Sequence, residues 1–278
     1  MIRYGLCLVA VVLTALQTAA ADEDRAPWRR LFDRTAADYR LTRPADSGPA
    51  PLKLVDGATY TWARSGPHDG NYGNVYVWTH QGNAEAVACF WRWVDADGRP
   101  AVVHELHSLS PTKLESSGDT ARSWKPKGPL ERHPLEGAPV PAESAVGRMS
   151  QMRALCRDLA ARSEGAAGDR TELRLLPQPL YRYQSTNPDV VDGALFAFVC
   201  SVGTDPELFL QLEALRTPEG PRWHYTLSRF SHMSLFVQYR DQPLWQAVRD
   251  AENPISHNAD HTYWVFHAPF DPASLRSD

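Results

Sequence analysis

The sequence has little of what marks several common protein classes. Its four cysteines are widely spaced among 278 residues, so it lacks the dense cysteine pattern of a disulfide scaffold. Lys and Arg total 29 against 33 Asp and Glu, which leaves no excess of positive charge for binding nucleic acid or anionic lipid. After the N-terminus, no apolar run approaches the ~20 residues of a membrane span. These absences favour a globular protein with a sizeable core.

The sequence also lacks the common catalytic and cofactor motifs. It has no Gly-x-Ser-x-Gly nucleophile elbow, no phosphate-binding glycine-rich loop and no dinucleotide fingerprint after a strand. We therefore expect no cofactor. The missing motifs lower the expectation of an enzyme without excluding one, because active sites are often assembled from residues far apart in sequence.

The N-terminus has the three parts of a secretory signal peptide. Arg3 supplies a short basic region, residues 6–16 are apolar, and Ala19, Ala20 and Ala21 offer a small-residue cleavage site. The apolar run is about half of the ~20 residues that a membrane anchor needs. Cleavage after residue 21 removes one base and leaves 28 Lys and Arg against 33 Asp and Glu. We predict an exported protein, periplasmic or secreted, with no membrane span once the signal is removed.

Three cysteines remain after cleavage: Cys89, Cys156 and Cys200. Export to an oxidising compartment would allow one disulfide. Each cysteine, however, lies within an apolar strand-like or helix-like pattern, where a free cysteine behaves as a small buried hydrophobe. The sequence favours burial and leaves open whether any two of them form a disulfide.

The chain carries one pattern twice, 121 residues apart. The phrase LKLVDGATYTW at 52–62 returns as LRLLPQPLYRY at 173–183, and the same offset is recovered near the end of each copy. A fixed offset that is recovered after a gap indicates an internal duplication. The matched pairs are Leu52 with Leu173, Leu54 with Leu175, Tyr60 with Tyr181, Pro67 with Pro188, Gly82 with Gly203, Leu114 with Leu235 and Trp124 with Trp245.

Each copy is predicted to begin with a helix and to continue with short antiparallel strands. Apolar residues at helical spacing mark one helix from Trp28 to Tyr39. They mark a second from a Ser144 cap, through a stripe that includes Leu159, to Gly165. Runs rich in Val, Leu, Phe, Tyr and Trp predict strands near 52–55, 58–64, 74–80, 86–94, 101–109, 112–117, 172–176, 179–185, 194–201, 207–215, 222–230, 232–239 and 261–266.

These patterns predict an α+β fold of two tandem helix-plus-antiparallel-sheet modules related by pseudo-two-fold symmetry. The later strands are apolar on both faces, so each sheet needs a helix on one face and the other copy or the linker on the second. Five prolines in the linker resist helix and ladder pairing. The predicted divisions are a signal peptide at 1–21, a first module at 22–124, a Pro-rich linker at 125–144, a second module at 145–250 and a tail with one strand at 251–278.

The chain contains the phrases HELHSLS at 104–110, QMRALCRDLAA at 151–161, LRLLPQPLYRY at 173–183 and DGALFAFVCSVGTDPEL at 192–208. In these phrases it resembles a family of exported bacterial proteins of unknown function that have internally duplicated helix-plus-sheet modules. The likeness spans roughly residues 28–245. It implies export and a duplicated organisation, and because the family has no assigned reaction or ligand, it carries over no functional residue.

The most chemical-looking string is HELH at 104–107. On a strand, Glu105 and His107 share one face while His104 points to the other. They are either an acid–base or metal-binding pair for a hydrolase or a hydrogen-bonded pair at the sheet surface, and we favour the second. His257 and His261 have the i, i+4 spacing of a helical zinc motif, but they lie in a predicted loop without a defined third ligand. We therefore predict no metal site.

Two further groups are candidates for a binding site. Trp91 and Trp93 share a strand face, where their rings could stack on a sugar or another flat ligand or pack against the other copy. Tyr72 lies in a glycine-rich loop beside them. Packing against the other copy is the favoured interpretation of the tryptophans. Glu207 and Glu213 are also spaced for one strand face, and we interpret them as ordinary solvated positions.

From these features we expect a non-catalytic binding or structural module that acts outside the cytoplasm. Its partner would be a glycan, an envelope component or a protein, and not nucleic acid. The alternative is a hydrolase, with or without a metal, that uses Glu105 and His107.

Overall fold

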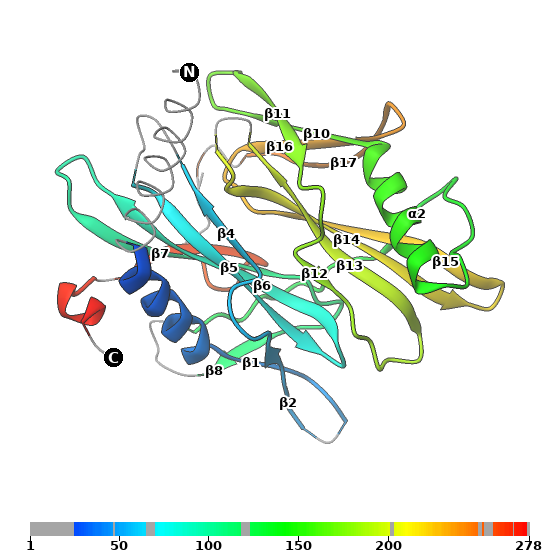
Figure 1. The fold of residues 1–278 in the computed structure, drawn as a ribbon, viewed down its shortest axis with the longest axis horizontal. Helices are drawn as coiled ribbons and strands as arrows, with labels where there is room; N and C mark the ends of the chain where they lie inside the picture. Colours follow the sequence, from blue (N-terminus) through cyan, green and yellow to red (C-terminus); the bar gives the residue numbers. More distant parts are fainter. Residues whose placement is uncertain are drawn as a thin grey trace, which may run out of the picture.

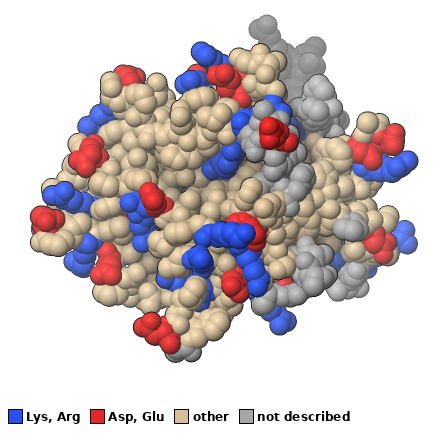
Figure 2. All heavy atoms as spheres, turned by 180° about the vertical axis from the view of Figure 1, so that it is seen from behind, with Lys and Arg blue, Asp and Glu red and all other residues tan. Residues whose placement is uncertain are grey.

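The structure, a computed structural model, describes residues 25–46, 48–64, 70–117, 123–200, 203–249, 252, 258–268 and 270–276. The predicted signal peptide and His257 lie outside this part of the chain. The described residues combine antiparallel sheets with two α-helices, which confirms the predicted α+β class (Figure 1). Within this part, no helix is both long enough and apolar enough to cross a membrane. Acidic and basic side chains are interspersed over the face seen in Figure 2.

The first large sheet combines strands from the N-terminal half of the chain with the C-terminal strand. Its order is β18-β7-β6-β5-β3, and β4 also pairs with β5. A helix over residues 25–38 precedes it, and a small sheet of order β2-β1-β8 packs beside it. The bounds are β1 Arg40–Arg43, β2 Ala50–Pro51, β3 Lys53–Leu54, β4 Tyr60–Ala63, β5 Tyr72–His80, β6 Asn83–Val94, β7 Pro100–Ser108, β8 Glu115–Ser117 and β18 Tyr263–Ala268.

The second large sheet combines strands from the C-terminal half with one strand of the linker. Its order is β17-β16-β10-β11-β13-β14-β15-β9, and β12 also pairs with β13. The helix α2, Ala145–Arg157, precedes it, and the 3-10 helix η2, Pro272–Leu275, lies after the last strand. The bounds are β9 His133–Pro134, β10 Leu159–Glu164, β11 Arg170–Leu175, β12 Tyr181–Arg182, β13 Val190–Val199, β14 Pro206–Thr217, β15 Gly220–Arg229, β16 Ser234–Tyr239 and β17 Gln242–Ala247.

The two sheets pack face to face around a shared core. Val75 and Val77 of β5 lie in one buried cluster with Leu195 and Ala197 of β13. Because successive side chains of a strand point to opposite faces, Tyr76 and Trp78 of β5 face outward, away from the second sheet. The strands are therefore apolar on both faces because both faces are covered.

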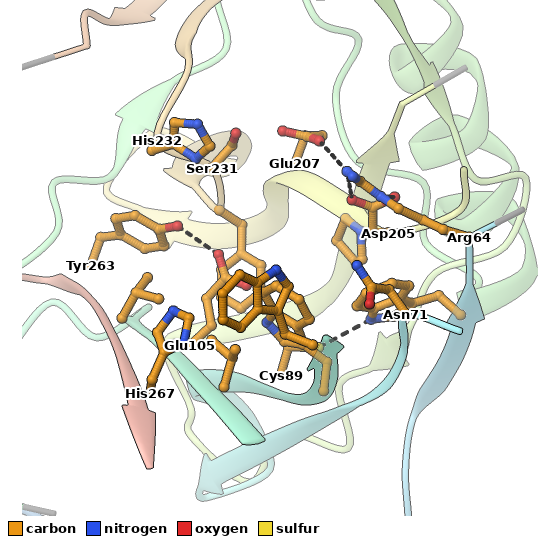
Figure 3. Close-up of a pocket in the computed structure, with 17 residues that line it drawn as sticks. Arg64, Asn71, Cys89, Glu105, Asp205, Glu207, Ser231, His232, Tyr263 and His267 are labelled. Carbon is orange, nitrogen blue, oxygen red and sulfur yellow. Dashed lines mark hydrogen bonds and ion pairs between the residues drawn. The ribbon is translucent and has the colours of Figure 1, made fainter. Parts of the chain in front are cut away.

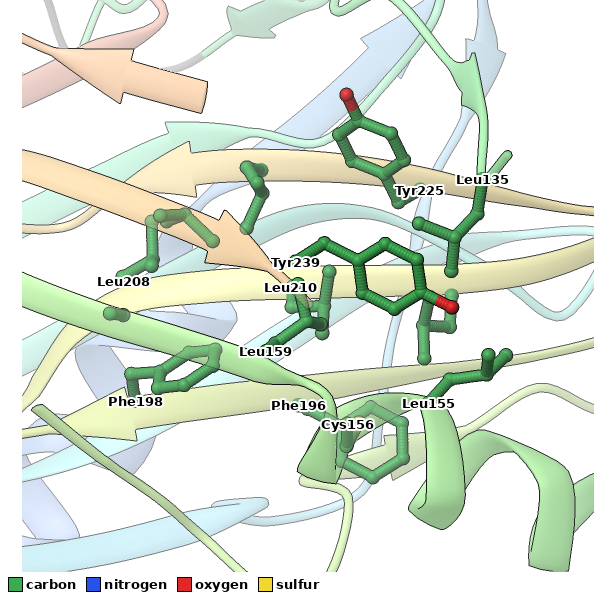
Figure 4. Close-up of a cluster of buried hydrophobic side chains, with 14 of the residues drawn as sticks. Leu135, Leu155, Cys156, Leu159, Phe196, Phe198, Leu208, Leu210, Tyr225 and Tyr239 are labelled. Carbon is green, nitrogen blue, oxygen red and sulfur yellow. The ribbon is translucent and has the colours of Figure 1, made fainter. Parts of the chain in front are cut away.

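A helix covers the outer face of each large sheet. Phe32 of the first helix is fully buried against the β5 and β6 side chains. Met152 of α2 is buried in the same way against Phe196 and Phe198 of β13, in the cluster drawn in Figure 4. The two helices lie at opposite sides of the molecule in Figure 1, which gives a helix, sheet, sheet, helix order of layers.

The turns at the ends of the long hairpins link the two sheets. Gln81 and Gly82, both with positive φ, form the β5–β6 turn, and a Cβ on Gly82 would collide with the backbone of Gln184. The Tyr181 hydroxyl donates to the Gly82 carbonyl at 3.0 Å. In the opposite direction, the Tyr60 hydroxyl donates to the carbonyl of Thr204, in the β13–β14 connection, at 2.9 Å.

The second helix is shorter than predicted. Ser144 caps it, with its side chain accepting from the Gly147 backbone N–H, but α2 ends at Arg157 rather than near Gly165. The chain turns at Asp158, and Leu159 begins β10, which pairs with both β11 and β16. Leu159 is still buried, because β10 packs beneath the same helix.

The linker pairs more than its proline content predicts. His133 and Pro134 form the short edge strand β9 on β15, a position that tolerates proline because one side of an edge strand needs no ladder bond. Each predicted strand has an observed counterpart, whereas five short strands escaped prediction. These are β1, β2, β9, β10 and β17.

The three cysteines of the described chain are free thiols. Cys89 and Cys156 are buried, as predicted, and Cys200 is half-buried. No disulfide joins any two of these three in the structure.

We predict that Leu159→Ala lowers the free energy of unfolding by about 2–5 kcal/mol, because it leaves a cavity under α2. Urea denaturation followed by circular dichroism measures this loss. The matched control is Val146→Ala on the same helix, whose residue is 83% exposed and whose loss should stay within about 0.5 kcal/mol. Equal losses in the two variants would contradict the assignment of this face to the core.

Candidate functional site

A cavity of about 320 Å³ lies between the two large sheets (Figure 3). The first sheet contributes walls from β4, β6, β7 and β18, and the second contributes the start of β14 and residues 230–232 after β15. A volume of this size suits a small ligand of a few rings or fewer. The site depends on both sheets, so neither half of the chain forms it alone.

Tryptophan rings form much of the apolar wall. Alternation along β6 places Trp91 and Trp93 on the cavity side together with Cys89. The ring of Trp62, from β4, lies 5.9 Å from that of Trp91, and the Trp62 indole N–H donates to the Cys89 sulfur at 3.1 Å. Both β6 tryptophans are only partly buried, so their faces are available to a ligand.

Glu105 of β7 brings a carboxyl group into this wall. The Tyr263 hydroxyl donates to its Oε1 at 2.6 Å. Burial raises the pKa of Glu105 to about 8, and the nearby Glu207 and Asp205 raise it further, while the Tyr263 hydrogen bond acts in the opposite direction. At neutral pH this carboxyl is therefore mostly protonated.

Glu207 brings a second carboxyl group from the opposite sheet. Burial raises its pKa to about 7, an effect that Ser231 and Arg64 reduce and Asp205 increases. Its Oε1 lies 3.9 Å from the Arg64 guanidinium, and its Oε2 is buried with no hydrogen bond of normal geometry. A buried polar atom without a partner is costly, so Oε2 marks a place where a ligand donor would be favourable.

Arg64 is committed to another carboxylate. Its Nε and Nη2 atoms bind the two oxygens of Asp205 at 3.0 and 2.5 Å. Such a two-point contact is stronger than a single ion pair, and it leaves only the long contact to Glu207. The cavity therefore holds three acidic side chains and one arginine that is largely satisfied by one of them.

One group of potential metal ligands lies at the edge of the cavity. The Cys200 sulfur and carboxylate oxygens of Asp205 and Glu207 lie within 4.8 Å of one another. A metal would require the Cys200 thiolate, but burial raises the pKa of this thiol, as do both carboxylates. Arg64 already binds Asp205, so we build no metal site on these residues.

Glu105 and His107 do not form a pair in the structure. Both face the inter-sheet side of β7, and the prediction that they lie at the sheet surface is wrong. His107 does not line the cavity; its Nδ1 contacts the Ser108 carbonyl at 2.5 Å. Burial lowers the pKa of His107 to about 4, with a further decrease from Arg229 that the Ser108 carbonyl opposes. A neutral, backbone-bound histidine outside the cavity does not form an acid–base pair with Glu105.

The other candidates also fall into two groups. Trp91 and Trp93 line the cavity. Tyr72 lies on the opposite face of the sheet, under the first helix, where the centre of its ring is 6.4 Å from the centre of the Trp28 ring. Glu207 and Glu213 are buried rather than solvated. Sequence reasoning missed a role for Trp62, Arg64, Asp205 and Tyr263, which reach the cavity from three separate segments.

The chain was compared with known families, proteins and structures. No family profile matches it, and neither a curated protein nor a solved structure is detectably similar to it. The resemblance to exported bacterial proteins thus remains a hypothesis, and function must be argued from the site.

We predict that Glu105→Gln flattens the pH dependence of stability. Glu105 stays protonated in the folded protein up to about pH 8 but ionises near pH 4.3 in an unfolded chain. The unfolded state thus binds fewer protons, and stability falls as pH rises between these values, by up to about 1.4 kcal/mol per pH unit. Urea denaturation at pH 5, 6, 7 and 8 should show a smaller fall in the variant.

The matched control for this experiment is Glu172→Gln, at an exposed position of β11. It should follow the pH dependence of the unsubstituted protein. If Glu105→Gln follows it too, the carboxyl group of Glu105 is not protonated in the fold.

Proposed function

We propose that the protein is a non-catalytic binding module whose ligand occupies the cavity between the two sheets. The observation that carries the proposal is the combination of partly exposed tryptophans with a buried carboxylate oxygen on Glu207 that has no hydrogen bond of normal geometry. Apolar walls with a few convergent polar groups are the usual make-up of a ligand site. The expected setting is outside the cytoplasm, periplasmic or secreted, and the ligand could be a free small molecule or part of an envelope component, glycan or protein.

We also propose that the binding module arose by internal duplication into two modules related by pseudo-two-fold symmetry. The strand connections support this: β10 pairs with β11 and β16, as β1 pairs with β2 and β8. The contacts between the sheets are reciprocal as well, since Tyr60 binds the turn of the second half and Tyr181 binds the turn of the first. In a two-fold interface the same patch is used twice, and these tyrosines are 121 residues apart.

A hydrolase is the second candidate. The carboxyl groups of Glu105 and Glu207 have pKa values of about 8 and 7, which is the range of catalytic acids and bases. The predicted partner His107 lies outside the cavity, and among the described residues lining the cavity no serine or cysteine is hydrogen-bonded to a histidine. Binding is therefore the better-supported function.

The binding proposal predicts that Trp91→Ala weakens ligand binding about tenfold, by removing one aromatic face from the cavity. Saturation-transfer NMR with a defined panel of monosaccharides, amino acids and small amines identifies binders to the whole protein. Titration of any binder then gives the affinities of the variants. The matched control is Trp245→Ala, which removes a similarly half-buried tryptophan of β17 far from the cavity lining. The proposal is contradicted by a panel without binders, or by Trp91→Ala binding as tightly as the control.

A further inference from the structure

The interface between the sheets has two ends built on the same pattern. At one end, the Leu109 N–H donates to the Glu85 carbonyl at 2.8 Å; at the other, the Phe230 N–H donates to the Glu207 carbonyl at 2.8 Å. Glu85 and Glu207 both lie near the start of the long second strand of their sheets, β6 and β14. The two glutamates therefore hold equivalent places.

Their surroundings agree with this match. Burial raises the pKa of Glu85 and of Glu207, and in each case a serine hydroxyl acts against the increase. The serine is Ser110 for Glu85 and Ser231 for Glu207. Each serine directly follows the residue whose N–H binds the glutamate carbonyl.

An aromatic contact is also present at both ends. The Trp62 indole donates to the Cys89 sulfur at 3.1 Å, and the Gln211 amide donates to the Tyr183 hydroxyl at 2.7 Å. Trp62 lies in β4 and Tyr183 directly follows β12, and these short strands precede the long hairpins β5–β6 and β13–β14. Cys89 and Gln211 lie in the middle of β6 and β14. Trp62 thus corresponds to Tyr183, and Cys89 corresponds to Gln211.

The strand registers extend the match to the next strand. Cys89 pairs with Glu105 across β6 and β7, and Gln211 pairs with Thr226 across β14 and β15. Glu105 therefore corresponds to Thr226. Only the end with the open cavity has a carboxyl group at this position.

One step further along the same strands, the two ends differ again. Trp91 pairs with Val103, and Glu213 pairs with His224. Trp91 thus corresponds to Glu213. The open cavity has an aromatic face where the other end has a carboxylate.

Each sheet is completed by a strand from outside its own half: β18 on β7, and β9 on β15. Tyr263, Val265 and His267 of β18 line the cavity, and Val265 is the one of them that pairs with Glu105. The equivalent position next to β9 is Arg132. Val103 pairs with His267 of β18, and the corresponding His224 pairs with Pro134 of β9. Two residues along each antiparallel ladder, Val265 lies opposite Glu105 and Arg132 lies opposite Thr226.

Arg132 fills its own end of the interface. Its Nε and Nη2 atoms bind the Glu213 carboxylate at 2.6 and 3.1 Å, and the Glu213 side chain is only 1% exposed. Burial lowers the pKa of Arg132, but Glu213, Tyr183 and Glu85 outweigh this effect and raise it overall. A guanidinium from the linker thus neutralises the buried Glu213 carboxylate, while Glu85 at the same end pairs with Arg43 at 3.0 Å.

We infer that the open cavity binds a small organic cation, a guanidinium or alkylammonium group, in the place that Arg132 fills at the other end. The short side chain of Val265 does not fill this place, and Glu105 and Glu207 face it from opposite sheets (Figure 3). The rings of Trp62 and Trp91 supply faces that attract cations. The inference rests on the proposed function, since it names the ligand class of the same cavity.

Binding of a cation should release protons from the cavity. Glu105 and Glu207, with pKa values of about 8 and 7, are largely protonated at pH 6 and ionised at pH 9, and the cation favours their ionised forms. Three other charged side chains lie near the carboxyl groups of Glu105 and Glu207. They are Arg64, Asp205 and Arg229, which lies over the Tyr263 ring.

Other titratable groups face the same space. Burial lowers the pKa of His232 and raises that of Cys89, Cys200 and Tyr263. Each of these shifts favours the uncharged form of the group. His267 also lines the cavity. Variants of Glu105 and Glu207 therefore identify which groups release the protons on binding.

The test is isothermal titration calorimetry of the whole protein with ethylguanidinium at pH 6, 7.5 and 9. The control ligand is ethylurea, which has the same shape and no charge. We expect ethylguanidinium to bind at least about tenfold more tightly at pH 9 than at pH 6, as linkage to one released proton requires, and ethylurea not to bind. Repeating pH 7.5 in buffers of different ionisation enthalpy counts the protons.

Variants locate the binding and assign the protons. Glu105→Gln and Glu207→Gln should each weaken ethylguanidinium binding at pH 9 and reduce the number of protons released. Glu172→Gln, at an exposed position, should change neither. The tripeptide glycyl-arginyl-glycine, tested in parallel, distinguishes a free small cation from an arginine side chain of a peptide.

The outcomes separate this inference from the proposed function. Equal binding of ethylguanidinium and ethylurea would show that the cavity takes a neutral ligand. Binding without proton release would show that the cation does not pair with the carboxyl groups of Glu105 and Glu207. Either result would overturn the inference alone. If neither probe binds but a neutral member of the NMR panel does, the inference fails in the same way. If no compound binds in either experiment, both fail.

Discussion

The structure depends on one constraint: two sheets that are apolar on both faces must cover each other. Helices bury the outer faces through Phe32 and Met152, and the inner faces then have only the opposite sheet as cover. Apolar side chains meet in the middle of the interface, where packing is close. Towards the ends of the long strands the sheets carry polar and charged residues, and there the interface must either pair them or leave them space. The cavity is a consequence of how those ends are resolved.

The two ends resolve the same problem in different ways. Carboxyl groups buried between sheets are costly unless a cation or a proton neutralises them. At one end Arg132 neutralises Glu213 directly. At the other end Arg64 is taken up by Asp205, and Glu105 and Glu207 keep protons instead, as their raised pKa values indicate. A proton on a carboxyl group can be displaced by a cationic ligand. An arginine of the chain, in contrast, stays in place and neutralises its carboxylate permanently.

Much of the fold could be predicted from the sequence, because the predicted strands had strong period-two patterns or two-sided apolar runs. The strands that escaped, such as β1 and β9, are short and held by their partners rather than by their own composition. Leu159 shows the limit of periodicity: it continues the apolar stripe of α2 but belongs to β10, and both placements bury it. The site was less predictable. Trp91 and Glu105 were identified, but Trp62, Asp205 and Tyr263 reach the cavity only through tertiary pairing.

Under the proposed duplication, the sequence signal for the site lies in the differences between the two halves of the chain rather than in their likeness. Residues that pack the common core can stay alike in both copies, whereas a site present at one end only must differ between them. Glu105 corresponds to Thr226, Trp91 corresponds to Glu213, and Val265 corresponds to Arg132. Glu105, Trp91 and Val265 all line the cavity. With only the sequence, the offset of 121 aligns the copies but not the strands β9 and β18, because these strands exchange partners between halves. The difference between Val265 and Arg132 thus becomes visible only when the strand ladders place both residues at the third strand of the interface.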